Sequence, residues 1–181
     1  MIDISLPILG TNILIRELKA GDLEALYDLE VEPCVKCYLG GPVKKSRSEW
    51  IESMTRGLSN PMFVLPFIVA TKDTAEFVGR AHLTKTDNDH PYPEMQVVIA
   101  KRHWGKRLGR EVAALLIDAA FGELRTASVI AVVHPDNKAS LDLLENLGFV
   151  QVGTNQSGGW DNGNLIFRRD RVGYAPARIS D

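Results

Sequence analysis

The chain has 181 residues, 45% of them hydrophobic and 24% charged, with a formal net charge of -2 at pH 7. A chain of this length buries roughly 70% of its unfolded surface, so we expect one domain over residues 1–181 that needs no disulfides. The charge balance gives no electrostatic basis for a nucleic acid or an anionic membrane as the main partner. No apolar run approaches the ~20 residues of a membrane span, and the N-terminus lacks a basic segment and a long apolar core, so we expect a cytoplasmic protein.

The two cysteines form a single C-x-x-C, at Cys34 and Cys37. Such a pair can be a redox centre or half of a zinc site. A structural zinc ion takes four ligands, and the sequence has no second C-x-x-C and no paired-histidine motif. We therefore expect two reduced thiols near a helix end and no metal; a redox or metal role is the alternative.

The N-terminal part of the chain predicts a strand followed by two helices. Residues 13–18 read as a strand, and Asp22 is a typical N-cap for a helix whose leucines recur at helical spacing. Pro33 ends this helix. After a Gly-Gly-Pro break, a second helix begins at about Ser46.

Two strands, over residues 63–70 and 76–85, are joined closely enough to form a hairpin. The second strand alternates, so His82 lies on one face with Arg80. The polar, proline-rich stretch 86–93 reads as a surface loop.

The most informative stretch runs from residue 94 to residue 121. Residues 95–100 have the length and the Val/Ile content of a buried strand, and apolar residues recur at helical spacing from Leu108. Because first-turn amides have no intrahelical partners and the helix dipole adds positive charge, the turn between strand and helix should bind a phosphate or pyrophosphate. That turn is basic and contains a glycine: Arg102-His103-Trp104-Gly105-Lys106-Arg107.

The C-terminal part predicts a strand over residues 127–134 and a helix that Asp136 caps and Gly148 ends. Two closing strands, 150–154 and 165–171, flank a loop rich in glycine and asparagine, and the tail beyond them has little signal of order. Neighbouring strands joined by hairpin-length links, with helices between them, indicate an α+β fold.

The basic turn resembles the R/Q-x-x-G-x-G/A signature of the GNAT superfamily of acetyl-CoA-dependent N-acetyltransferases. The stretch 94–111 looks most like the ribosomal-protein-alanine (RimJ/RimL-type) branch. Residues 132–149 resemble the family's strand, its N-x-x-S and its E-K-h-G-F helix. One residue departs from the pattern: Arg107 stands where the family has glycine or alanine.

The resemblance implies a mixed, mostly antiparallel sheet of six to seven strands flanked by about four helices. The sheet would be splayed between the strands at Val97 and Val132, with acetyl-CoA in the gap. An acceptor amine, from a protein N-terminus or a small molecule, would attack directly in a ternary complex; its identity and the oligomeric state are left open, and a homodimer is compatible with the sequence. The alternative is a non-catalytic acyl-CoA-binding or interaction module, suggested by Arg107 and by Leu144, which stands where other members place a tyrosine acid.

Acetyl transfer needs a neutral amine, stabilisation of the oxyanion and a proton for the leaving thiolate. The resemblance makes Glu94 the preferred base, because it begins the central strand, and His82 is the second candidate. Ser140, or a water that it holds, is the expected proton donor.

The resemblance also implies the cofactor contacts. Backbone N–H groups of Val98 or Ile99 would stabilise the oxyanion, and Asn137 would bind the pantetheine arm, which runs beside the strand. Arg110 could approach a phosphate. The expected cofactor-binding residues are Val98, Ile99, Ala100, His103, Trp104, Gly105, Lys106, Arg107, Leu108, Gly109, Asn137 and Ser140.

Overall fold

The structure is a computed structural model that describes residues 4–41, 43–60, 62–85, 91–156 and 161–171. Its helices are α1 (Leu23–Val31), α2 (Pro33–Lys36), α3 (Arg47–Leu58), α4 (Leu108–Gly122) and α5 (Lys138–Asn146), with the 3-10 turns η1 (Ala20–Asp22) and η2 (Lys101–His103). Its strands are β1 (Ile8–Leu9), β2 (Ile13–Arg16), β3 (Phe67–Thr71), β4 (Phe77–Lys85), β5 (Pro93–Ile99), β6 (Ser128–Val133), β7 (Val150–Thr154) and β8 (Leu165–Asp170).

The strands form one sheet in the order β1-β2-β3-β4-β5-β6-β8-β7. Every neighbouring pair is antiparallel except β5 and β6, which run parallel. Among the described residues, the parallel pair is in register at one position only, Glu94 opposite Ile130. The two strands therefore separate beyond Glu94, and the expected α+β sheet with a gap between its central strands is confirmed.

The sheet has eight strands where six to seven were expected, because Ile8–Leu9 pairs with β2 as a two-residue edge strand. Two residues are too few to produce an alternating pattern in the sequence. Helix α2 was also missed, since Pro33 does not only follow α1 but also begins the next helix at its first position.

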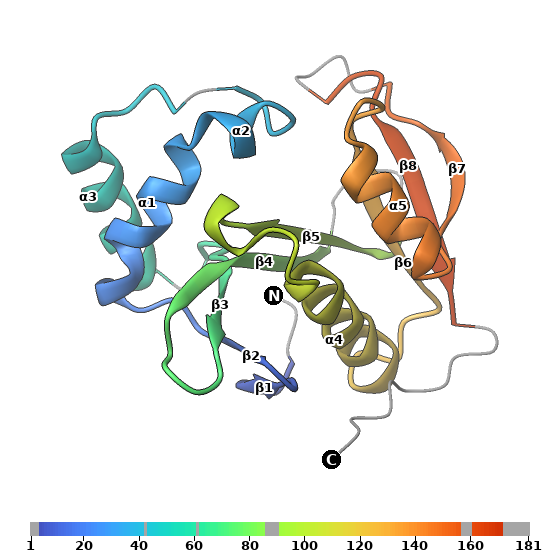
Figure 1. Cartoon of the computed structure of the whole chain (residues 1–181), viewed down its shortest axis with the longest axis horizontal. Helices are drawn as coiled ribbons and strands as arrows, with labels where there is room; N and C mark the ends of the chain where they lie inside the picture. Colours follow the sequence, from blue (N-terminus) through green and yellow to red (C-terminus); the bar gives the residue numbers. More distant parts are fainter. Residues whose placement is uncertain (1–3, 42, 61, 86–90, 157–160, 172–181) are drawn as a thin grey trace.

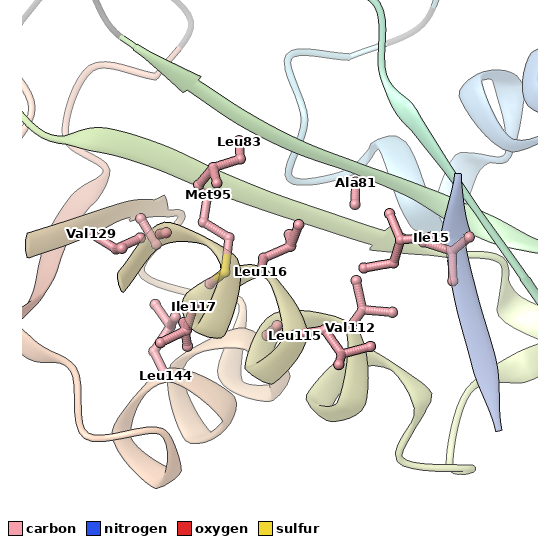
Figure 2. Close-up of a cluster of buried hydrophobic side chains, with 14 of the residues drawn as sticks. Ile15, Ala81, Leu83, Met95, Val112, Leu115, Leu116, Ile117, Val129 and Leu144 are labelled. Carbon is pink, nitrogen blue, oxygen red and sulfur yellow. The ribbon is translucent and has the colours of Figure 1, made fainter. Parts of the chain in front are cut away.

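Helices cover both faces of the sheet, with α4 and α5 on one face and α1 and α3 on the other (Figure 1). The buried side of α4 packs on Ile15, Ala81 and Met95 of three different strands (Figure 2). On the other face, a smaller cluster joins Leu26 of α1 to Val98 of β5. The sheet thus separates a large apolar core from a smaller one beneath α1.

Local boundaries differ from the prediction in two places. Strand β3 begins at Phe67 rather than near residue 63, and Met62 and Val64 are exposed. The cap of α5 is Asn137, not Asp136, because the Asn137 Oδ1 accepts the Ser140 N–H at 3.2 Å. The loop expected over 86–93, the loop between the last strands and the tail from 172 lie partly or wholly outside the described residues.

The backbones of β4 and β5 pass very close to each other at Gly79. A Cβ at this residue would lie 2.1 Å from the carbonyl oxygen of Val98. The register between β3 and β4 also shifts near this point, between Val69 and Ala70. Only glycine fits at this residue, because the backbone of β5 leaves no space for a side chain.

Candidate active site

The start of the basic turn is engaged within the protein. The N–H of His103 donates to the Ala100 carbonyl oxygen at 2.9 Å, and the N–H of Trp104 donates to that of Lys101 at 3.0 Å. Both bonds belong to the 3-10 turn η2, which the sequence did not predict. The expectation that the His103 and Trp104 amides bind an anion is therefore corrected.

The next five amides are different. The N–H groups of residues 105–109 donate to no acceptor among the described residues. Gly105 and Arg107 have positive φ values of 76° and 60°, so the turn winds in the left-handed sense immediately before α4. Successive N–H groups in such a conformation form a concave anion site, to which the helix dipole adds. The structure thus offers an anion cradle at Gly105, Lys106, Arg107, Leu108 and Gly109.

Arg107 explains why the family pattern has a small residue here. It is the N-cap of α4 and adopts the left-handed conformation, with φ 60° and ψ 10°. Glycine enters this region without penalty, whereas a side chain costs roughly 1–2 kcal/mol. The departure at Arg107 therefore changes the strain of the turn and not its path.

The side chains of His103 and Trp104 hold the turn in place. His103 is 4% exposed and its Nε2 lies 3.2 Å from the Phe77 carbonyl oxygen. Trp104 is half-exposed, and its indole N–H donates to the Ile99 carbonyl oxygen at 2.7 Å. The Trp104 indole thus ties the turn to the end of β5.

Backbone groups at the end of β5 point alternately to β4 and to the gap. The Ala100 N–H donates to the Val78 carbonyl oxygen at 2.9 Å, on the β4 side. Because N–H groups alternate along a strand, the Val98 amide also points to β4, and the amides of Val97 and Ile99 point to the gap. This corrects the expectation for Val98 and Ala100. Val97 was missed, and counting the alternation would have required the register.

Glu94 lies where β5 and β6 begin to separate, opposite Thr84 on β4 and Ile130 on β6. Burial raises the pKa of its carboxyl group, and the negative charge of Asp161 raises this pKa further. A carboxylate with a raised pKa is a better proton acceptor near neutral pH. Asp161 belongs to the loop before β8 and was not anticipated from the sequence.

His82 lies on the β4 strand opposite Gln96, diagonal to Glu94. Burial lowers the pKa of His82 to about 4, and the positive charge of Arg80 contributes to this shift. The imidazole is therefore neutral at physiological pH and only weakly basic. Of the two candidate bases, Glu94 has the environment that suits the role better.

A buried charge network lies beside these two residues and was missed. Arg80, 8% exposed, donates from Nε to Glu30 of α1 and from Nη1 to Gln96 of β5. Lys36 of α2 contacts the other Glu30 oxygen at 3.2 Å. Burial alone would raise the pKa of Glu30, but the charges of Arg80 and Lys36 outweigh this effect and lower the pKa. The alternation of β4 placed Arg80 on this face, yet no pattern identifies its partners.

Asn137 and Ser140 stand together at the start of α5. The Asn137 side-chain oxygen accepts the helix-cap bond, and its amide nitrogen is a donor that a ligand could use. Ser140 is half-buried in the first turn of the helix. The structure thus preserves the expected pair but assigns one atom of Asn137 to the fold.

An aromatic contact joins the two sides of the molecule. The rings of Tyr38, which follows α2, and His134, which follows β6, have centroids 5.2 Å apart at 36°. The His134 Nδ1 accepts the Asp136 N–H at 3.1 Å. Because His134 lies three residues before Asn137, Tyr38 approaches the start of α5 from the opposite wall.

Arg110, expected near a phosphate, lines a cavity of about 470 Å³. This cavity lies between α4 and the end of α5, and Arg169 of β8 supplies a second guanidinium.

The cysteines and the helices of the described part of the chain bear on the remaining expectations. Cys34 and Cys37 are free thiols, and the Cys37 thiol contacts the Cys34 carbonyl oxygen at 3.1 Å. Within the described residues, no three His, Cys, Asp or Glu side chains are grouped as a metal site would require. None of the helices described combines the length and the apolar character needed to cross a bilayer.

Comparison with known proteins gives a consistent result. The sequence profile of the Acetyltransferase (GNAT) domain matches residues 12–150. The uncharacterized N-acetyltransferase p20 of Bacillus licheniformis is 31% identical over 87 residues, 48% of this chain and 49% of p20. A GNAT-family acetyltransferase from Bacillus anthracis superposes with a TM-score of 0.74 at 19% identity, over 90% of this chain and 96% of that one. Spermidine N-acetyltransferase from Vibrio cholerae, in complex with CoA and spermine, gives 0.71 at 23% identity, over 87% and 93%.

Proposed function

Because the chain belongs to the GNAT acetyltransferase family, we propose that it transfers the acetyl group of acetyl-CoA to a primary amine, on a protein N-terminus or a small molecule, in a ternary complex. N-acetyl transfer is the activity of the family. The acceptor, the direct attack and the residues that carry it are the content of the proposal.

The observation that supports the proposal best is the run of unpaired amides at residues 105–109. These donors fit a pyrophosphate. The cationic side chains that would neutralise the phosphate charge are those of Lys106, Arg107 and Arg110. The gap-facing N–H groups of Val97 and Ile99 would serve the pantetheine arm and the developing oxyanion. Asn137 Nδ2 would bind the same arm.

The acceptor sets the demand on the base. A lysine-like amine costs about 4 to 5 kcal/mol to deprotonate at pH 7, whereas an α-amine costs only about 1 kcal/mol. In the proposed step the amine nitrogen bonds to the thioester carbon, Glu94 accepts the amine proton, the C–S bond breaks, and Ser140 or its water protonates the thiolate. A carboxylate with a raised pKa, such as Glu94, is sufficient for an α-amine.

The test follows free thiol as acetyl-CoA is mixed with a panel of peptides and small amines. Glu94→Gln should lower kcat about 1,000-fold, since general-base catalysis contributes 10²- to 10⁴-fold, and leave the KM for acetyl-CoA unchanged. Asp161→Asn should move the acidic limb of the pH–rate profile to lower pH, because it removes one of the two causes that raise the pKa of Glu94.

The matched control is Glu145→Gln, which alters an exposed glutamate near the end of α5 and should leave both constants unchanged. A Glu94→Gln enzyme with normal kcat would exclude Glu94 as the base. CoA binding without turnover across the whole panel would instead support the non-catalytic acyl-CoA-binding module.

A further inference from the structure

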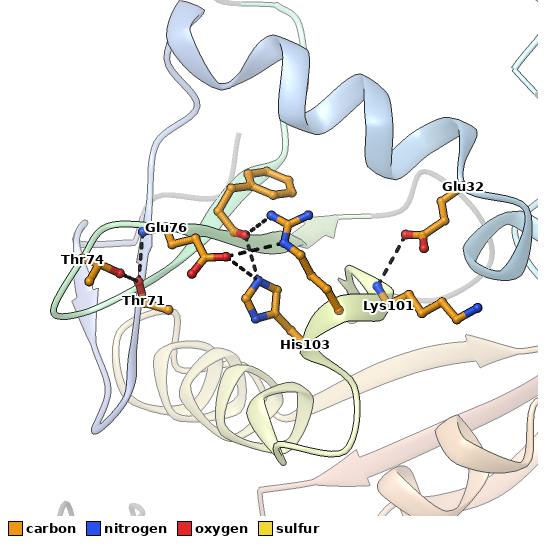
Figure 3. Close-up of polar contacts among 8 residues, drawn as sticks. Glu32, Thr71, Thr74, Glu76, Lys101 and His103 are labelled. Atoms are coloured by element: carbon orange, nitrogen blue, oxygen red, sulfur yellow. Dashed lines mark hydrogen bonds and ion pairs between the residues drawn. The ribbon is translucent and has the colours of Figure 1, made fainter.

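The turn that leads into the anion cradle is fixed to the β3–β4 hairpin by two side chains. The His103 Nε2 lies 3.2 Å from the Phe77 carbonyl oxygen and 3.3 Å from the Glu76 carboxylate (Figure 3). A carbonyl oxygen only accepts, so Nε2 carries the proton in this arrangement. The Arg102 Nη2 donates to the same carbonyl at 2.8 Å, and its Nε lies 3.5 Å from the Glu76 carboxylate. We call these four residues the hairpin bracket.

The hairpin end of the bracket is itself held firmly. The Glu76 N–H donates to the Thr71 hydroxyl at 2.9 Å, and this hydroxyl lies 2.6 Å from that of Thr74 (Figure 3). The Thr71 N–H donates back to the Glu76 carbonyl oxygen at 2.9 Å. Glu76 is therefore a fixed point to which the η2 turn can be attached.

The members of the bracket differ in burial. The His103 side chain is 5% exposed, whereas Arg102 and Glu76 are 56% and 52% exposed. An exposed ion pair contributes little because solvent screens it, and a buried hydrogen bond is costly to lose. His103 is thus the main anchor, and Glu76 strengthens it.

The bracket acts on the approach to the cradle. Before Gly105, the amides of Ala100, His103 and Trp104 are all paired, and the Lys101 N–H lies 3.4 Å from the Glu32 carboxylate on the other side. After that point the amides lose their partners. The anchored η2 turn therefore fixes the direction of the free N–H groups that follow it. Donors that are already fixed bind an anion without the entropic cost of ordering the turn.

We propose that His103, supported by Glu76, is a positioning residue for the pyrophosphate: it sets CoA affinity from beneath the turn without touching the ligand. The inference rests on the proposed function, since it takes the cradle to be the CoA site. It gives the β3–β4 hairpin a role in cofactor binding although the hairpin lies outside the gap between β5 and β6.

The experiment compares CoA, measured by calorimetry, with pantetheine, measured by NMR titration, because pantetheine lacks the pyrophosphate. His103→Ala should weaken CoA binding about 10-fold and leave pantetheine unchanged, as expected for a defect confined to the anion turn. His103→Gln retains an N–H donor of similar reach and should restore CoA affinity to within about 3-fold. Glu76→Ala changes a surface residue and should not affect folding. It should weaken CoA binding about 3-fold.

Ser128→Ala is the matched control, because it removes a buried side-chain hydrogen bond to Asp170 at 2.6 Å on another part of the sheet. Unchanged CoA affinity in His103→Ala and Glu76→Ala would overturn the proposal, as would an equal loss of CoA and pantetheine affinity. If the unmodified protein does not bind CoA, the proposed function fails instead, and the two failures are told apart in the first titration.

Discussion

The two walls of the candidate site are built from different material. The proposed cofactor wall, at residues 105–109, offers main-chain N–H groups whose directions are set by the left-handed turn before α4. The proposed acceptor wall, formed by α1, β4 and β5, offers side chains from distant segments, including Glu30, Arg80 and His82. A backbone site tolerates substitution while the turn keeps its path, as Arg107 illustrates. A side-chain site changes its chemistry with each substitution, so the acceptor wall is where specificity should reside.

Removing Glu30 is the strongest test of the acceptor wall. Glu30→Ala leaves Arg80 buried without its carboxylate, which should lower the free energy of unfolding by about 3–5 kcal/mol. Urea denaturation measures the loss. Glu52→Ala is the control, because its ion pair with Arg56 is exposed and should contribute no more than about 0.5 kcal/mol. Equal effects of the two substitutions would mean that the network is not buried in solution.

The neutral state of His82 gives the acceptor wall a pH signature. The folded protein binds this proton near pH 4 and the unfolded chain near pH 6.5, so the unfolded state binds more protons between these values. The free energy of unfolding should fall by up to about 3 kcal/mol as the pH drops from 6.5 to 4. In His82→Gln this part of the fall should disappear, and an unaltered profile would contradict the assignment.

Arg107→Gly separates strain from contact on the cofactor wall. Glycine should relieve the left-handed backbone and raise the free energy of unfolding by up to about 1 kcal/mol. If the Arg107 side chain contacts phosphate, CoA affinity should fall about 3- to 10-fold at the same time. Thermal unfolding measures the change in stability, and calorimetry measures the change in CoA affinity. Lower stability in Arg107→Gly would contradict the strain, and unchanged affinity would show that the backbone alone serves the anion.

The unpaired amides at residues 105–109 could be predicted from the sequence because the feature is local. A strand, a basic turn with Gly105 and a helix follow one another within a short stretch, and their order alone indicates unpaired amides. The η2 turn was not predicted. The amides of His103 and Trp104 were therefore expected to bind the anion, whereas in the structure they are hydrogen-bonded within this turn. The acceptor wall could not be predicted, because Arg80, Glu30 and Gln96 come from three separate elements. The Tyr38–His134 contact likewise depends on how α2 lies against the end of β6.

The single registered pair between β5 and β6 has a consequence for the lifetimes of individual amide protons. Near the end of β5, the Val98 amide proton points to β4 and is protected by it. The amide protons of Val97 and Ile99 point to the gap, where no strand among the described residues pairs with β5. Deuterium should enter the two odd positions quickly and the even one slowly. A bound thioester would slow the exchange at Val97 and Ile99. The exchange at Val98 in the same strand then serves as the reference against which binding is measured.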